Sequence, residues 1–355
     1  MQITFILPGS AHNPIGGFKV VFEYANTLIN LGHKVTILLL ASCSTDGNFK
    51  NKIIRNGYFL YRLSSQSYLP NKWFYINPEI DVHWLPSLSN KSIPDADVII
   101  ATSWQTAVLV NGIPSKKGEK YYLIQHIEDW SGDYNKVLST WKLPLRKIVI
   151  SKWLQYAVQQ AGEDSVYIPN GLDFTAFNID NPIIERENNN VMMLYHKEKW
   201  KGSNDGIAAL EIVKKEMPDV AANLYGVFPQ PKIPRWVRYT KSPSQKHLRD
   251  LYNRSSIFIS PSWAEGFPLP PCEAMMCGAA LVATDIGGHR EMAFDNVTAL
   301  LSPAHSPDYM ADRIMYLLNH PDTRHSIASA AYKYVQRFTW EKSTEKLLSY
   351  LSTHH

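Results

Sequence analysis

The sequence predicts an α/β fold of two Rossmann-type domains, each a doubly wound parallel sheet, facing a cleft. Its 355 residues exceed the roughly 150 residues of one average domain. Nearly continuous apolar runs alternate with amphipathic stretches of helical period, which is typical of parallel strands covered on both faces. This alternation stops at a polar stretch and then begins again. We therefore expect one domain at residues 1–172 and a second at residues 173–337.

The first domain alternates from its first apolar run, residues 2–7. A helix is expected over residues 16–30, because Val20, Tyr24 and Leu28 recur at helical spacing, and Gly32 ends it. Further strands, each before helical sequence or a loop, are expected at residues 35–40, 97–102, 121–125 and 147–150. Residues 50–94 are rich in aromatic residues, Asn and Ser, and we assign them no regular structure.

The second domain follows the same plan. A strand ends in a turn at residues 165–173, and the polar stretch 178–190, with three consecutive asparagines, is the best linker candidate. Strands are expected at residues 191–195, 221–225, 256–260 and 280–284, with helices at 203–216 and 245–253 and C-terminal helices after the last strand. In open parallel sheets, ligands bind outside the carboxyl ends of the strands. The loops with unusual residues (16–17, 125–126, 195–196, 265–269 and 287–288) all follow predicted strands.

Composition excludes several classes of protein. A net charge of +4 is too small to indicate nucleic-acid binding. Cys43, Cys272 and Cys277 form no disulfide framework or metal pair, and the last two are expected to be buried. The twelve histidines show no metal-ligand spacing. No signal peptide or apolar run of about 18 residues is present, so we expect a cytoplasmic protein. The terminal His354 and His355 are either native or a tag.

Two glutamates, Glu265 and Glu273, flank a Gly/Pro-rich turn between a strand and a short helix. Pro270 and Pro271 suit the start of this helix, and Gly278 suits its C′ position. Free N–H groups and the positive end of the helix dipole converge at such a corner and favour anions. A carboxylate on each side suits a ligand with phosphates in the middle and hydroxyls at both ends. These properties describe a nucleotide sugar.

With these features the sequence resembles the retaining glycosyltransferases of family 4, which have the GT-B fold. The resemblance extends over nearly the whole chain and is most specific in the second domain. It rests on Gly16-Gly17, residues 167–173, Lys201-Gly202, the Glu265…Glu273 pair and Gly287-Gly288…Glu291. It implies that the last helix, within residues 338–355, crosses back onto the first domain.

For the second domain, the resemblance implies contacts to the donor. Glu273 would bind the ribose hydroxyls, and Glu265 would face the hydroxyls of the donor sugar as a catalytic residue. Lys201 would neutralise the leaving diphosphate. The chain segment of Gly266, Phe267, Pro268 and Leu269 would supply backbone contacts, although Pro268 has no N–H to donate. The alternative for Glu265 is a solvated loop carboxylate. The alternative for Glu273 is a carboxylate that interacts with the positive end of the helix dipole.

One position departs from the family pattern. An arginine normally precedes the lysine by about five residues, but His196 stands there, with Lys197 and Lys199 nearby. A histidine carries a weaker, pH-dependent charge, so the donor diphosphate is expected to be bound differently. In the first domain, Gly16 and Gly17 would let the backbone approach the phosphates.

The resemblance also implies that His126 is the first-domain catalytic residue beside the donor sugar. A structural histidine is the alternative. Glu128 and Asp129, next to it, would either orient the acceptor or be solvated. Asp95-Ala-Asp97 matches a D-x-D metal motif, but it precedes a strand, so a polar strand entry is favoured. The glutamate pair does not suit a glycosidase acid–nucleophile dyad, because Glu273 is assigned to the ribose.

The expected function is retaining, metal-independent transfer of a hexose from a UDP-, GDP- or dTDP-sugar to a hydroxyl of a glycan or lipid-linked acceptor, in bacterial surface polysaccharide synthesis. The nucleotide sugar is a substrate, and no cofactor is expected. The alternatives are an inactive partner subunit, a phosphorylase with pyridoxal phosphate, and a sugar-nucleotide epimerase. Lys142, Arg146 and Lys147 are candidates for peripheral contact with the inner face of a membrane, and a solvated basic face is the alternative.

Overall fold

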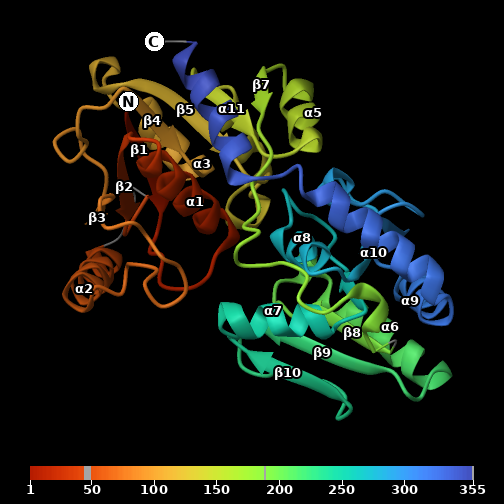
Figure 1. The fold of residues 1–355 in the computed structure, drawn as a ribbon. Coiled ribbons are helices and arrows are strands. Elements are labelled where there is room, and N and C mark those ends of the chain that lie inside the picture. The colour runs from red at the N-terminus through yellow and green to blue at the C-terminus, as the bar shows by residue number, and fades with distance from the viewer. Residues whose placement is uncertain (44–48, 188, 354–355) are drawn as a thin grey trace. The chain divides into compact units, whose positions relative to one another are not determined.

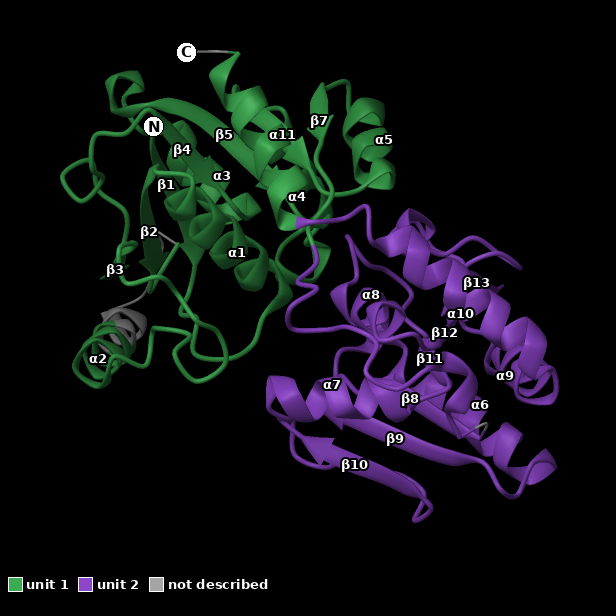
Figure 2. Cartoon of the chain, viewed as in Figure 1, with its two compact units in different colours: residues 1–171, 340–355 green, residues 172–339 purple. Residues whose placement is uncertain are grey.

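The computed structural model describes residues 1–43, 49–187 and 189–353 (Figure 1). Asn188 of the asparagine run, His354 and His355 lie outside the described residues. The chain forms two compact units, residues 1–171 with 340–355 (unit 1) and residues 172–339 (unit 2) (Figure 2). The predicted domain boundaries lie after residues 172 and 337. The C-terminal helix therefore belongs to the same unit as the N-terminal strands, as expected.

Unit 1 is built on a seven-stranded, all-parallel sheet in the order β3-β2-β1-β4-β5-β6-β7. Its strands are β1 (Gln2–Pro8), β2 (Lys34–Leu40), β3 (Asp81–Leu85), β4 (Val98–Ala101), β5 (Glu119–Ile124), β6 (Arg146–Val149) and β7 (Ser165–Tyr167). Its helices are α1 (Gly16–Asn30), α2 (Phe49–Ser65), α3 (Trp104–Asn111), α4 (Tyr134–Trp141), α5 (Lys152–Gln160) and α11 (Trp340–Ser352). The strand order reverses between β1 and β4, which places a topological switch point there.

Helix α1 has the predicted bounds. It buries Val20, Tyr24 and Leu28, and Gly32 follows it with a φ of +82°, a conformation that glycine adopts without a Cβ penalty. Helix α3 begins at a capping box formed by Ser103 and Thr106. This box satisfies two of the backbone N–H groups that every helix start leaves without an intrahelical acceptor.

The lack of regular structure predicted for residues 50–94 is wrong, because the chain there forms α2 and β3. Helix α2 was missed because its sequence is polar overall, although its apolar residues recur with a helical period. Ile54, Leu60 and Tyr61 are 69%, 59% and 67% exposed. A helix that is polar overall resembles a loop by composition, even where its apolar residues keep the helical period.

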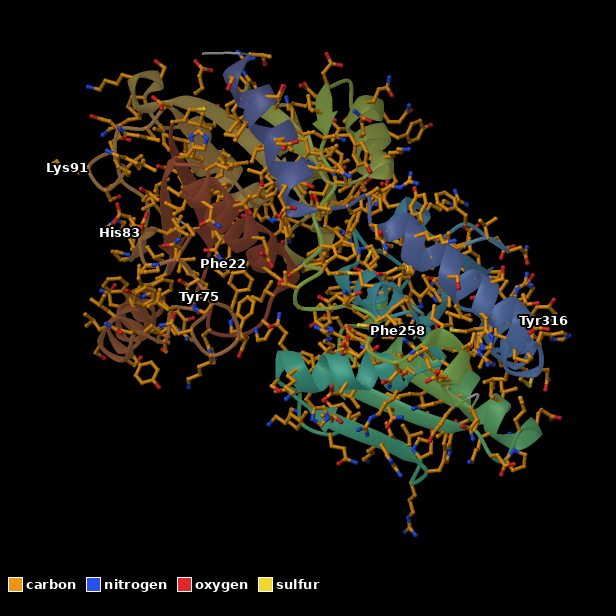
Figure 3. The ribbon with its side chains drawn as sticks, in the orientation of Figure 1. Phe22, Tyr75, His83, Lys91, Phe258 and Tyr316 are labelled. Carbon is orange, nitrogen blue, oxygen red and sulfur yellow. The ribbon has the colours of Figure 1, made fainter. Side chains whose placement is uncertain are left out.

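Unit 2 has a six-stranded, all-parallel sheet in the order β10-β9-β8-β11-β12-β13. Its strands are β8 (Asn190–Leu194), β9 (Ala221–Gly226), β10 (Val237–Lys241), β11 (Ile257–Ser260), β12 (Ala280–Thr284) and β13 (Ala299–Ser302). Its helices are α6 (Ser203–Glu216), α7 (Gln245–Arg254), α8 (Leu269–Met276), α9 (Pro307–Asn319) and α10 (Pro321–Val335). Phe258 of β11 lies inside this unit (Figure 3) and is 1% exposed. Strands β10 and β13 were not predicted.

The polar stretch 178–190 is not a linker. It belongs to unit 2, where Asn253 Oδ1 accepts hydrogen bonds from the backbone N–H groups of Asp180 (2.7 Å) and Asn181 (3.2 Å). The buried Arg186 guanidinium donates to the Ser255 carbonyl at 3.1 Å. Polar composition predicted a solvated segment, but these partners allow the segment to pack. The chain passes between the units at residues 171–172 and 339–340.

No helix in the described parts of the chain is long and apolar enough to cross a membrane.

Candidate functional site

The loops singled out in the sequence do follow the carboxyl ends of parallel strands. In unit 1, Gly16-Gly17 comes after β1 and His126 after β5. In unit 2, His196 follows β8, Glu265 follows β11 and Gly288 follows β12. Each sheet therefore presents its candidate residues at the edge where ligands bind to such folds.

An ion pair between Lys201 and Glu265 forms the centre of the unit 2 site. Lys201 ends a short 3₁₀ turn, η4 (Lys199–Lys201), and its Nζ lies 2.7 and 2.8 Å from the two Glu265 carboxylate oxygens. Ser262 Oγ donates to Oε1 at 2.8 Å. Burial raises the pKa of Glu265, but the charge and hydrogen bonds of Lys201 and the hydrogen bond from Ser262 outweigh it, and the net pKa is lowered. The carboxylate is therefore ionised beside a cation, and Lys201 keeps 26% of its side chain exposed.

Two glycines let the loops of this site pack at backbone distance. Gly202 has a φ of +61°, and a Cβ there would lie 2.0 Å from the Pro261 carbonyl oxygen. A Cβ on Gly288 would lie 2.4 Å from the Glu265 carbonyl oxygen. Any other residue would separate these loops, so the glycines fix the position of the ion pair.

His289, in the 3₁₀ turn η5 (His289–Glu291), is a buried residue of this site that the sequence analysis did not select. Its Nδ1 lies 2.7 Å from the Thr284 carbonyl oxygen, and its Nε2 lies 2.8 Å from Ser260 Oγ. A carbonyl only accepts, so Nδ1 carries the proton and Nε2 accepts from Ser260. Burial lowers the pKa of His289, which keeps the ring neutral beneath Glu265. The adjacent Gly287-Gly288 was the signal that marked this position.

Glu273 lies on α8, which begins at Leu269 and ends before Gly278 (φ +81°). It is 8% exposed, and Tyr252 donates a hydrogen bond to its Oε2 at 3.2 Å. Glu273 is the fifth residue of α8 and therefore lies just past its first turn. The first turn instead contains prolines, which lack N–H donors. Gly266, Phe267 and Pro268 lead into this helix and Leu269 begins it, and all four residues are buried.

The His196 side chain stabilises its own loop. Its Nδ1 accepts a hydrogen bond from the Glu198 N–H at 3.2 Å, and its ring meets the Phe228 ring edge-on at 4.9 Å. Burial, and then the charge of Lys201, lower its pKa. The ring is therefore neutral at physiological pH and does not replace the charge of an arginine.

In unit 1, the His126 ring makes edge-on contacts with two indole rings, with ring-centroid distances of 4.5 Å to Trp130 and 6.0 Å to Trp153. Its Nδ1 accepts from the Ile127 N–H at 2.9 Å, which assigns the ring hydrogen of the neutral form to Nε2. The neighbouring Gln125 donates through Nε2 to the Gly17 carbonyl at 3.2 Å. The first-domain residues predicted for the site, Gly17 and His126, are therefore connected through one side chain.

Glu128 and Asp129 differ in environment. Asp129 is exposed, whereas Glu128 is buried, with its backbone in the left-handed region (φ 64°). Its Oε2 accepts from the Trp104 N–H, in the first turn of α3, at 3.1 Å. Burial raises the pKa of Glu128 to about 8. Solvation, one of the two alternatives for this pair, is therefore wrong for Glu128.

Two other expectations concern charged side chains. Lys147 is 6% exposed and pairs with Glu163 at 2.6 Å, so the proposed membrane contact is wrong for this lysine. Asp97 accepts from the Gln2 N–H at 2.7 Å, and Asp95 pairs with Lys117 at 2.8 Å. This confirms a polar strand entry.

Within residues 1–43, 49–187 and 189–353, no three His, Cys, Asp or Glu side chains form a group that could bind a metal ion.

Comparison with known proteins relates this geometry to glycosyltransferases. Residues 184–334 match the family model of the glycosyl transferases group 1. A D-inositol 3-phosphate glycosyltransferase of Kribbella flavida is 35% identical over 112 residues, which are 32% of this chain and 26% of that protein. The aligned part thus spans about a quarter of that relative's length. A phosphatidyl-myo-inositol mannosyltransferase of Mycolicibacterium smegmatis is 23% identical over 99% of this chain and 94% of its own.

Among solved structures, HepE of Anabaena in complex with UDP-glucose superposes with a TM-score of 0.75 and 19% identity, covering 99% of this chain and 100% of that chain. At this identity the likeness establishes the architecture. The fold is GT-B, with two Rossmann-type parallel sheets, as the sequence predicted.

Proposed function

We propose that this protein is a retaining glycosyltransferase of family 4 that transfers a hexose from a nucleotide sugar to an acceptor hydroxyl. The observation that carries the proposal is the Lys201–Glu265 ion pair at the carboxyl edge of the unit 2 sheet. A carboxylate accepts hydrogen bonds from sugar hydroxyls, and an ammonium 2.7 Å away favours an anionic leaving group. The group 1 match over the same unit supports this assignment.

In the proposed mechanism, Glu273 binds the ribose hydroxyls and Glu265 orients the donor sugar. The bond between the anomeric carbon and the diphosphate oxygen breaks, and a bond from the acceptor oxygen forms on the same face of the sugar. The departing diphosphate takes the acceptor proton, so no carboxylate base is required. Lys201 stabilises the charge that develops on this leaving group. His126 stays a predicted catalytic residue of unit 1, and neither a metal nor a cofactor takes part.

We further propose a UDP-, GDP- or dTDP-sugar as the donor and a glycan or lipid-linked molecule as the acceptor, in surface polysaccharide synthesis on the cytoplasmic side of a membrane. HepE was crystallised with UDP-glucose, which supports a nucleotide-sugar donor. One observation favours a second candidate, a binding subunit without turnover. His196, at the position of the usual arginine, is neutral and adds no charge for the leaving group.

Donor binding is tested by thermal unfolding with UDP-, GDP-, dTDP- and ADP-sugars. A ligand at about 100 times its Kd stabilises the folded state by roughly 2.7 kcal/mol. We expect one nucleotide series to raise the Tm of the wild type but not of Lys201→Met or Glu273→Ala. Glu211→Gln changes an exposed carboxylate of α6 in the same unit and is the matched control. If no nucleotide sugar raises the Tm, the donor site is refuted.

Turnover is tested separately, by donor hydrolysis and by transfer to a panel of acceptors, with NMR of the anomeric proton in the product. Retention of configuration is expected. Nucleotide binding without hydrolysis or transfer would replace the enzyme proposal with the binding subunit. Product formed without any acceptor would instead indicate an epimerase.

A further inference from the structure

The loop after β1 in unit 1 is connected to the segment that joins α2 to β3. Ser10 Oγ and Tyr58 Oη are 3.1 Å apart, and the Ala11 N–H donates to the Tyr68 carbonyl at 2.9 Å. Trp73 Nε1 donates to the Ala11 carbonyl at 2.7 Å. These three bonds place His12, the next residue, beside this segment at the carboxyl end of β1.

Two cations of that segment flank these bonds, because Arg62 lies over the Tyr58 ring and Lys72 directly precedes Trp73 in the chain. Burial, and then the charges of Arg62 and Lys72, lower the pKa of the His12 imidazole. Arg62 is itself oriented, because its Nη1 donates to the Ser67 carbonyl at 2.9 Å and its guanidinium lies 4.7 Å from the centre of the Tyr58 ring. His12, Arg62 and Lys72 therefore form a basic cluster, which we call the β1 cluster.

In the part of the chain that the structure describes, no acidic side chain pairs with a cation of the β1 cluster. The sequence contains no Asp or Glu in residues 1–22 or 47–78, whereas residues 47–78 contain Lys50, Lys52, Arg55, Arg62 and Lys72. Among the side chains that the structure describes, neither Arg62 nor Lys72 forms an ion pair. Uncompensated positive charge at the ligand-binding edge of a parallel sheet favours an anionic ligand.

We propose that the β1 cluster binds a phosphate group of the acceptor. This assignment rests on the proposed function in one respect, that the ligand at this edge of unit 1 is the glycosyl acceptor. A guanidinium and an ammonium bind phosphate oxygens through charge-assisted hydrogen bonds. A neutral imidazole beside them adds one donor without adding repulsion between cations. The phosphate belongs either to a soluble phosphate ester or to a phospholipid headgroup.

The test is calorimetric titration of the full chain with inorganic phosphate. The titration uses a Lys201→Met background, so that phosphate does not bind beside that lysine in unit 2. We expect Arg62→Gln/Lys72→Gln to weaken phosphate binding about tenfold or more, since each substitution removes a charged partner. The matched control is Lys91→Gln/Lys116→Gln, which removes the same charge from two exposed lysines of unit 1. Lys91 lies on a peripheral loop (Figure 3), and binding by this control is expected to stay unchanged.

A second variant separates binding from folding. Arg62 bonds to Ser67, so its loss can perturb α2, whereas Lys72 is exposed, and Lys72→Gln alone is expected to weaken binding with unchanged circular dichroism. Equal phosphate affinity in the Arg62/Lys72 and Lys91/Lys116 variants would overturn the proposal. The titration requires neither donor nor turnover, so it stands apart from the nucleotide experiments that test the proposed function.

Cosedimentation with vesicles distinguishes the two sources of phosphate. A lipid headgroup is identified if the protein sediments with vesicles of equimolar phosphatidylcholine and phosphatidylglycerol but not with vesicles of phosphatidylcholine alone. In that case, Arg62→Gln/Lys72→Gln should abolish the sedimentation. Phosphate binding that depends on Arg62 and Lys72 without sedimentation identifies a soluble ester. If the protein binds neither phosphate nor vesicles, the β1 cluster is not an anion site.

Discussion

Glu128 is predicted to make the stability of unit 1 depend on pH. Its carboxyl group is buried against the first turn of α3, and its pKa rises from 4.5 to about 8. In the unfolded chain the same group titrates near 4.5. Between these two values the folded state binds one more proton than the unfolded state, so the free energy of unfolding falls as pH rises. The contribution is complete below about pH 4.5 and is lost as pH passes through about 8.

The perturbation is Glu128→Gln, which keeps an oxygen to accept from the Trp104 N–H but cannot ionise. One pKa unit corresponds to about 1.4 kcal/mol, so the shift of Glu128 amounts to at most roughly 5 kcal/mol. Between about pH 6 and pH 9 the wild type is expected to lose roughly 3 kcal/mol more than the variant, because the slope of about 1.4 kcal/mol per pH unit ends near the folded pKa of about 8. The glutamine variant should therefore be the more stable protein at about pH 9.

The assay is urea unfolding at both pH values, followed by tryptophan fluorescence and circular dichroism. Hydrogen exchange at residues 104 and 128–132 reports local opening of the same loop. Asp129→Asn is the matched control, because Asp129 is adjacent and exposed, and it should leave the pH dependence as in the wild type. A stability difference between wild type and Glu128→Gln that stays constant from pH 6 to pH 9 would refute the burial argument.

Three further predictions concern unit 2. Gly202→Ala should destabilise the protein by about 3 kcal/mol or more in urea unfolding. The added Cβ would lie 2.0 Å from the Pro261 carbonyl oxygen, on a residue whose φ is positive. An unchanged free energy of unfolding would mean that the loop moves freely. Glu265→Gln should lower kcat/KM about 100-fold or more and destabilise the protein by about 1–2 kcal/mol, because it leaves the partly exposed Lys201 unpaired; unchanged kinetics would remove Glu265 from the mechanism. Asn253→Ala should lower stability by about 1–2 kcal/mol, because two part-buried backbone N–H groups lose their acceptor. An unchanged Tm would show that water replaces it.

Much of the fold follows from sequence, because buried parallel strands read as apolar runs and glycines mark helix ends. Helix α1 illustrates both signals, with its buried stripe and Gly32. Helix α2 illustrates the limit, since its polar composition indicates a loop although its apolar residues keep a helical period. Strand β10 was missed for a related reason. It lies at the edge of the sheet, and its half-exposed sequence V-R-Y-T-K has no apolar run.

The candidate site followed from sequence where a residue type has one dominant chemical use, as with Glu265 and the glycines of its loops. Other features depended on tertiary contacts that no local pattern encodes. The direct pairing of Glu265 with Lys201 joins residues 64 positions apart. The burial of Glu128 and His289 depends on neighbouring elements that cover them. A polar residue in a loop can be exposed to solvent or buried with a hydrogen-bond partner. Only the packed structure distinguishes these two environments.

His196 shows why the charge of the unit 2 site must be considered as a whole. Lys201 carries a positive charge there, but Glu265 accepts both of its short contacts, and His196 and His289 are neutral because burial lowers their pKa values. The side chains nearest the ion pair therefore supply no net positive charge for a diphosphate. Its stabilisation has to come from backbone N–H groups, from Lys197 and Lys199, or from a Lys201 that exchanges Glu265 for phosphate. The last possibility couples the two proposed roles, because Glu265 is released to the sugar hydroxyls at the moment Lys201 turns to the leaving group.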